Sequence, residues 1–137
     1  MTPFKLTLDA VKAAAREAYA KGELGFQKGE QSCQYKGDRT GAPCAVGAAL
    51  PQELRDHLAT RLDFGHPVGW INGQGVSSLV REGILEIEND FEESAISRIQ
   101  REHDNVILEQ KFVSSRGGYP ENVQIAIQRF EEIIAEE

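Results

Sequence analysis

The chain has 137 residues, the size of one domain that buries roughly two thirds of its surface, so we expect a single globular domain over residues 1–137. Hydrophobic residues make up 40% and charged residues 27% of the chain, values that exclude an intrinsically disordered protein. Residues 1–61 carry nine Lys/Arg and seven Asp/Glu, a net +2, whereas residues 62–137 carry six and fifteen, a net −9, so the basic stripe typical of nucleic-acid binding is missing.

The sequence also indicates where the protein works. No apolar run approaches the ~18 residues that cross a bilayer, and the first 22 residues lack the apolar stretch of an export signal. We therefore expect a cytoplasmic protein that is not inserted in a membrane. In that compartment Cys33 and Cys44 are more consistent with two reduced thiols than with a disulfide.

The first helix is predicted over residues 7–21, because Thr7 can cap it and apolar residues recur at helical spacing until Gly22. The glycine-rich stretch from Gly22 to Pro43 is predicted to be a loop, with a short hairpin as the alternative near residues 31–43. Residues 31–35 would be the first strand of that hairpin.

The middle of the chain alternates short helices and loops. Small residues over 44–50 favour a short, tightly packed helix, and a second helix is predicted from Pro51 to Leu62 because leucines follow at intervals of four. Residues 64–75 are glycine-rich and contain the only tryptophan, Trp70. We expect a surface loop with Trp70 against the core, because this loop lacks the lysine of a phosphate-binding motif.

The second half predicts the longest helices. A short helix over residues 76–83 precedes a long one that Asp90 can cap, and this long helix carries His103 on its apolar face. A break at residues 114–119 leads to a closing helix from Pro120, with Phe130 at the centre of its apolar stripe. The predicted fold is therefore mainly α with about five helices, or a small α+β fold if the hairpin forms.

Three short patterns resemble those of a group of uncharacterised bacterial and bacteriophage proteins. They are Cys33-x-Tyr35, then Gly41-x-x-Cys44-Ala-Val-Gly47, and about 60 residues later Ile99-Gln100-x-x-His103-Asp104, where the group has L-Q-x-x-H-D. After Gly47 this sequence departs from the group's pattern, which has a bulkier apolar pair and an Ile-Pro-Asp turn. The resemblance implies a shared fold and a phage or mobile-element origin, but it carries no activity.

Cys44 is the candidate nucleophile if the protein is an enzyme. It precedes a predicted helix whose dipole would favour the thiolate, and His103 could serve as its base. However, Asp104 would point about 100° away from His103 on a helix, so it is a poor partner to orient the imidazole ring. We favour the structural interpretation, in which Cys44 and His103 are buried core residues and Asp104 accepts hydrogen bonds from amides of the first glycine-rich loop.

Neither a metal site nor a cofactor is predicted. A zinc site would need Cys33 and Cys44 together with two of the three histidines, and none of these residues occurs at the close spacing of zinc ligands. The remaining motif residues, Tyr35, Gly47 and Asp104, are then expected to have structural roles.

The acidic run around residue 90 is the candidate binding surface. It contains Glu86, Glu88, Asp90, Glu92 and Glu93, with no lysine or arginine between them. Such a run is commonly a solvated face, but it can also dock a basic protein surface. Our preferred hypothesis is a non-enzymatic interaction or regulatory protein that binds a protein partner through this acidic half. The alternative is a cysteine-dependent enzyme or small-ligand binder centred on Cys44, Tyr35 and His103.

Overall fold

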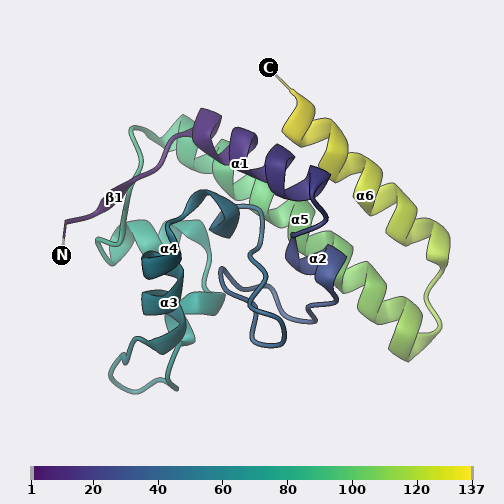
Figure 1. The fold of residues 1–137 in the computed structure, drawn as a ribbon, viewed down its shortest axis with the longest axis horizontal. Helices are drawn as coiled ribbons and strands as arrows, with labels where there is room; N and C mark the ends of the chain where they lie inside the picture. Colours follow the sequence, from purple (N-terminus) through teal and green to yellow (C-terminus); the bar gives the residue numbers. More distant parts are fainter. Residues whose placement is uncertain (1, 137) are drawn as a thin grey trace.

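The computed structural model describes residues 2–136 and is mainly helical, which confirms the predicted fold class (Figure 1). A long helix near the C-terminus forms the spine, and the last helix runs back along it. In chain order the elements are β1 (Phe4–Lys5), α1 (Leu8–Ala20), α2 (Gly25–Lys28), η1 (Gly47–Ala49), α3 (Gln52–Thr60), η2 (Trp70–Gly73), α4 (Val76–Arg81), β2 (Leu85–Glu86), α5 (Asp90–Arg116) and α6 (Pro120–Ala135), where η denotes a 3-10 turn.

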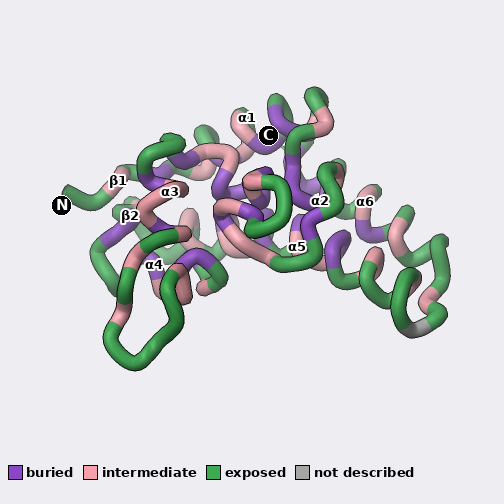
Figure 2. The backbone as a smooth tube through the Cα atoms, turned by 60° about the horizontal axis from the view of Figure 1, so that its bottom comes forward, coloured by how far each residue is buried: buried purple, intermediate pink, exposed green. Residues whose placement is uncertain are grey.

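The core lies where α1, α2, α5 and α6 meet. The buried face of α1 carries Val11, Ala15 and Ala18, which recur at the spacing of one helix face. Phe130 of α6 is fully buried, as the central position of its apolar stripe predicts. Figure 2 shows that buried segments gather at this junction, whereas the end of the α5–α6 pair is mostly exposed. No helix within residues 2–136 is long and apolar enough to span a bilayer.

Two strands of two residues each tie the start of the chain to the segment before α5. They pair in parallel, with Phe4 opposite Leu85 and Lys5 opposite Glu86. The Phe4 amide donates to the Ile84 carbonyl at 2.9 Å, and the Leu6 amide donates to the Glu86 carbonyl at 3.0 Å. Two-residue strands have no readable alternation, so sequence patterning does not predict this pairing.

The helix boundaries follow their caps. Thr7 caps α1, because its hydroxyl accepts the Ala10 amide at 3.1 Å, as predicted. The predicted cap of α5 is wrong by one residue: Asn89 accepts the Glu92 amide at 2.9 Å, and Asp90 already belongs to the first turn. There Asp90 still complements the helix dipole. α5 ends at Arg116 and is capped by Gly117, whose φ of +71° suits glycine.

The prediction of a loop from Gly22 to Pro43 is wrong at its start, because Gly25–Lys28 form the one-turn helix α2. Residues 29–46, which we call the first loop, contain no helix or strand, and the alternative hairpin is absent from this described segment. Residues 31–35 therefore do not form a strand. The short helix expected over residues 44–50 is reduced to the 3-10 turn η1. The hairpin does not form because amides of the loop donate to side chains and to η2 rather than to a second strand.

The second glycine-rich segment begins with an exposed loop that follows α3, at the lower left of Figure 1. Residues 62–69 are mostly exposed, and Leu62, expected at the end of the leucine stripe, lies beyond α3 in solvent. Trp70 packs partly buried against the core, as predicted, and its ring stacks on His66 with centroids 3.9 Å apart.

Candidate functional site

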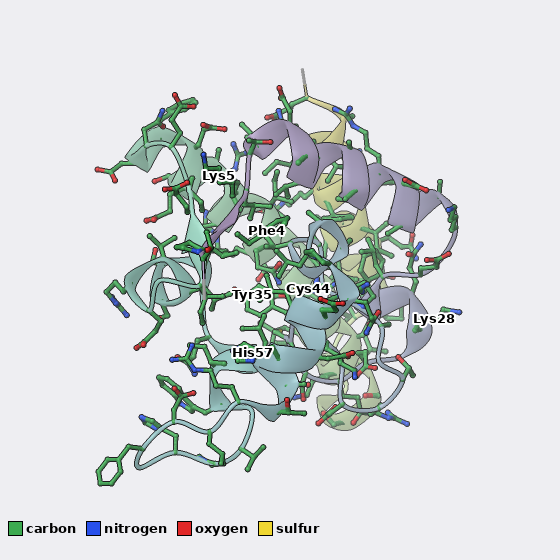
Figure 3. All side chains as sticks on the ribbon, turned by 60° about the vertical axis from the view of Figure 1, so that its left-hand side comes forward. Phe4, Lys5, Lys28, Tyr35, Cys44 and His57 are labelled. Carbon is green, nitrogen blue, oxygen red and sulfur yellow. The ribbon has the colours of Figure 1, made fainter. Side chains whose placement is uncertain are left out.

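Residues of all three sequence patterns meet around one small cavity. Cys33 and Tyr35 come from the first loop, Cys44 lies just before η1, and Gln100 and Asp104 lie on α5. Figure 3 labels Tyr35 and Cys44, which lie near the centre of the molecule. The cavity has a volume of about 70 Å³, and we call it the inner chamber. It is lined by Cys33, Gln34, Tyr35, Cys44, Gly73, Gln74, Gly75, Gln100 and Asp104.

The loop that carries Cys33 and Tyr35 is wrapped around a buried carboxylate. Glu30 is only 3% exposed, and its carboxylate accepts the amides of Arg39 (3.2 Å) and Thr40 (2.6 Å) and also the Thr40 hydroxyl. Burial opposes ionisation, but the Thr40 hydroxyl and these two amides outweigh it and lower the pKa of Glu30. A side chain at Gly37 would collide with this carboxylate, since a Cβ there would lie 2.1 Å from its carbon.

A second polar side chain, Asn72 of η2, holds the other edge of the same loop. Its amide group makes two hydrogen bonds with the backbone of Lys36: the Lys36 amide donates to Oδ1 at 3.0 Å, and Nδ2 donates to the carbonyl at 2.8 Å. The Tyr35 amide donates to the Asn72 carbonyl at 3.2 Å. Together these bonds fix where the Tyr35 backbone lies relative to η2.

Gly47 permits the close contact between η1 and the loop. A Cβ at this position would lie 2.4 Å from the Tyr35 carbonyl oxygen, far inside van der Waals contact. The Gly47 amide donates to the Cys44 sulfur at 3.3 Å, and the neighbouring Val46 amide donates to Gln100 Oε1 at 2.9 Å. The Cys44–Gly47 pattern thus fastens η1 to α5.

Gln100, His103 and Asp104 form a hydrogen-bonded group on α5. Asp104 Oδ1 accepts from Gln100 Nε2 at 2.8 Å and lies 3.0 Å from His103 Nδ1. The expectation that Asp104 is a poor partner for the imidazole ring of His103 is therefore wrong, because the carboxylate bends back across the 100° between the two side chains. The imidazole ring itself points into the core, where it meets Phe26 and Phe130 edge-on at 5.3 and 5.9 Å.

The role expected of Asp104 toward the amides of the first loop belongs to other residues. Asp104 accepts from Gln100 on its own helix and from the Cys33 thiol, whereas the loop amides are accepted by Glu30, Asn72 and Gln100. Sequence reasoning missed Glu30. The sequence signal that could have indicated it is an acidic residue directly after Gly29, about ten residues before the polar turn whose amides it accepts.

The two thiols are protonated groups in this setting. Cys44 is 1% exposed, and burial, reinforced by the charge of Asp104, raises its pKa. For the half-buried Cys33, burial, the Asp104 charge and a hydrogen bond to Asp104 raise the pKa to about 12. Both cysteines are free, and His103 is not among the residues that line the inner chamber. The structure thus brings Tyr35 and Cys44 together but leaves His103 on the other side of α5.

A larger depression adjoins the inner chamber. This outer groove has a volume of about 500 Å³ and shares Cys33, Gly75, Gln100 and Asp104 with the chamber. It runs between α4 and α5 and adds hydroxyl and guanidinium groups. The side chains that only the groove contributes are Val76, Ser77, Ser78, Arg81, Ser97, Arg101, Asn105 and Leu108.

The acidic run is divided between internal and exposed roles. Glu92 accepts the Leu8 amide at the start of α1 at 3.0 Å, and Glu93 accepts the Ser77 hydroxyl at 3.2 Å. Glu86 pairs with Lys5 at 3.8 Å in solvent. Glu88 and Asp90 are exposed beside Phe91, whose side chain is 77% exposed.

The described residues contain no group of three or more His, Cys, Asp or Glu side chains arranged to hold a metal ion. No family model matches the chain, and no curated protein or solved structure matches it either. The resemblance to the phage and bacterial group therefore stays a prediction, and the functional argument rests on the geometry of the chamber and the groove.

Proposed function

We propose that this protein is a non-enzymatic binder of a small polar molecule, which lies in the outer groove and places one group in the inner chamber. The observation that carries this proposal is the Tyr35 hydroxyl. It is buried at the chamber and has no hydrogen-bond partner among residues 2–136. A buried hydroxyl without a partner costs free energy, and a bound polar group would remove that cost.

The position of the patterned residues supports binding over covalent catalysis. A nucleophilic cysteine needs a thiolate and a base within hydrogen-bond reach. Cys44 instead has a raised pKa, and no hydrogen bond within the described chain joins it to His103. The site supplies shape and hydrogen bonds rather than an activated nucleophile.

The test is an NMR titration with small probes of four charge types: acetamide, acetate, ethylammonium and β-alanine. We expect at least one probe to shift the backbone amide signals of Cys33, Gly75 and Asp104 in a saturable way. The amide of Ile125, on the outward face of α6, serves as the internal control. Titrations in which no probe moves the chamber signals would overturn the proposal.

A second candidate function is docking of a protein partner at the acidic end of α5, and Phe91 is the observation that favours it. A large aromatic side chain that stays exposed beside Glu88 and Asp90 suits a partner with basic and apolar side chains. The proposed surface therefore consists of Glu88, Asp90 and Phe91 rather than the whole acidic run. Glu92 and Glu93 are left out because they form hydrogen bonds within the protein.

This candidate is tested with a fluorescent peptide of alternating lysine and leucine residues. We expect salt-sensitive binding that falls in the double variant Glu88→Lys/Asp90→Lys and in Phe91→Ser. The matched control is Glu121→Lys/Glu132→Lys, which changes the same charge at exposed positions of α6. Equal loss of binding in the control would show that net charge alone attracts the peptide.

A further inference from the structure

The inner chamber presents acceptors and weak donors but no cation. Its charged side chain is the Asp104 carboxylate, and no lysine or arginine is among its described lining residues. Its other polar side chains are Tyr35, the two cysteines and three glutamines, Gln34, Gln74 and Gln100. The Gln100 amide is already used by Val46 and Asp104, and Gln34 Oε1 accepts the Asp38 amide. A group that donates several hydrogen bonds and carries positive charge therefore fits this chamber best.

The outer groove has the opposite character. Arg81 and Arg101 both line it, on α4 and α5 respectively. Arg81 donates to Ser78 at 3.1 Å, whereas Arg101 has no hydrogen-bond or ion-pair partner in the part of the chain that the structure describes. An exposed guanidinium beside serine hydroxyls is a natural site for a carboxylate.

We propose that the ligand is a small zwitterion, with a primary ammonium group that enters the inner chamber between Tyr35 and Asp104 and a carboxylate that binds Arg101 in the outer groove. This inference rests on the proposed function and deepens it, because it names the chemical class of the ligand. The same chemistry occurs in free amino acids and at short peptide ends, and the probes below distinguish the two.

The size of the inner chamber limits what can enter it. One water molecule takes about 30 Å³ in the liquid, so a cavity of about 70 Å³ holds roughly two non-hydrogen atoms of a ligand head. A methylene with its ammonium group fits this space. A carboxylate in the same place would lie against the charge of Asp104, and like charges at short distance repel.

The hydrogen-bond inventory matches the ammonium group as well. A primary ammonium has three donors and no acceptor. The Tyr35 oxygen can accept one of them. Asp104 Oδ2 accepts neither Gln100 nor His103 among the described bonds, so the carboxylate can accept a second one beside the Cys33 thiol, which also donates to Asp104. Burial and the charge of Asp104 raise the pKa values of both thiols, so the thiols stay protonated and uncharged. The Asp104 carboxylate is therefore the anionic group that an ammonium would meet in the chamber.

The experiment measures dissociation constants for a series of ω-amino acids from glycine to 6-aminohexanoate by NMR titration. Ethylammonium lacks the carboxylate and acetate lacks the ammonium, so both serve as single-charge comparisons, and glycylglycine represents a peptide end. We expect affinity to pass through a maximum at one chain length and to exceed that of ethylammonium by about tenfold. Tighter binding of glycylglycine than of 5-aminopentanoate, the ω-amino acid of the same length, would assign the site to peptide ends.

Three variants locate the two charges of the ligand. Tyr35→Phe removes only the hydroxyl, and we expect about three- to tenfold weaker binding with unchanged or higher thermal stability, since that hydroxyl has no partner among residues 2–136. Asp104→Asn should weaken binding of ethylammonium by about tenfold or more. Arg101→Gln should weaken the zwitterion but not ethylammonium. Arg98→Gln is the matched control, because Arg98 lies on the same helix and lines a different groove beside α1.

The outcomes separate this inference from the proposed function. If acetamide or acetate shifts the chamber signals and no ammonium compound does, the ligand class is wrong and the binding function stands. If no probe shifts them, both proposals fail. A crystal structure soaked with the best ω-amino acid that shows only ordered water against Tyr35 would also overturn the zwitterion.

Discussion

The two sides of α5 are built in different ways. On one side, His103 meets Phe26 and Phe130 in a core formed by helices α1, α2 and α6. On the other side, Gln100 and Asp104 face η1, the first loop and the inner chamber. Adjacent residues of one helix thus serve an apolar core and a polar site.

The difference lies in what fixes each region. The apolar side is held by many contacts of similar kind, so no single one is essential to its geometry. The polar side is held by a few specific groups: the Glu30 carboxylate, the Asn72 amide and the absent side chain of Gly47. Substitutions can therefore separate the two regions, and the following predictions are given from the largest expected effect to the smallest.

The largest effect is expected in the apolar core. Phe130→Ala should lower the free energy of unfolding by about 3 to 5 kcal/mol, because it leaves a cavity among buried rings. Urea denaturation followed by circular dichroism measures it. Ile125→Ala, on the exposed part of the same helix, should change it by less than about 1 kcal/mol. Equal losses would mean that α6 is not held by this buried stripe.

Gly47→Ala should break the close contact of η1 with the first loop. The new methyl group would lie 2.4 Å from the Tyr35 carbonyl, so the backbone must move, at a cost of about 2 to 3 kcal/mol. Gly73→Ala is the control, because no atom of the described chain outside its immediate neighbours would lie within 4 Å of a Cβ there. Urea denaturation of both variants measures the difference, and similar midpoints would show that the loop yields easily.

The sequence predicts the apolar side well because that side is periodic. The stripes of α1, α5 and α6 repeat with the helix, and Thr7 and Pro120 mark two starts, so these elements were predicted to within a few residues. The predicted cap of α5 lies one residue too late, because Asn89 and Asp90 are both good capping residues. The hydrogen bond from the Glu92 amide identifies Asn89 as the cap.

The polar side has no period, and the sequence predicts it only in part. The short patterns pointed to Tyr35, Cys44 and Asp104, which the structure brings to one chamber. Glu30 and Asn72 were missed, since a carboxylate or amide that holds a loop depends on contacts far along the chain. For His103, the prediction of a buried core residue is confirmed, but its hydrogen bond with Asp104 is not predicted.

Glu30→Gln sharpens the comparison through pH. The native pKa of Glu30 lies below its ordinary value of 4.5, so its ionised form stabilises the fold above about pH 4.5. This contribution is lost as the pH falls through the lower native pKa. We expect the variant to be about 1.5 kcal/mol less stable at pH 7, with a difference that shrinks in acid. Urea denaturation across pH 3 to 7 tests this, and a constant difference would contradict it.

The smallest change in stability is expected for Cys33→Ser, at the border between the inner chamber and the outer groove. A serine hydroxyl keeps a donor for Asp104, and the site is half exposed, so the unfolding free energy should change by less than about 0.5 kcal/mol. The informative measurement is thiol labelling in the native state. With a pKa of about 12, Cys33 carries little thiolate at pH 8 and should react far more slowly than a free thiol, and its rate should rise with pH.

Labelling of Cys44 separates the two sides of α5 most finely. In the Cys33→Ser variant only Cys44 remains, and its burial and raised pKa leave local opening as the route by which a reagent reaches it. We expect its rate to follow the stability of the loop, so that Gly47→Ala accelerates labelling and Phe130→Ala does so only as far as it lowers global stability. His103→Asn should act through stability as well, because the imidazole lies outside the chamber. Rapid labelling of Cys44 that slows in His103→Asn without a loss of stability would instead couple the histidine to the thiol and revive a cysteine-dependent enzyme.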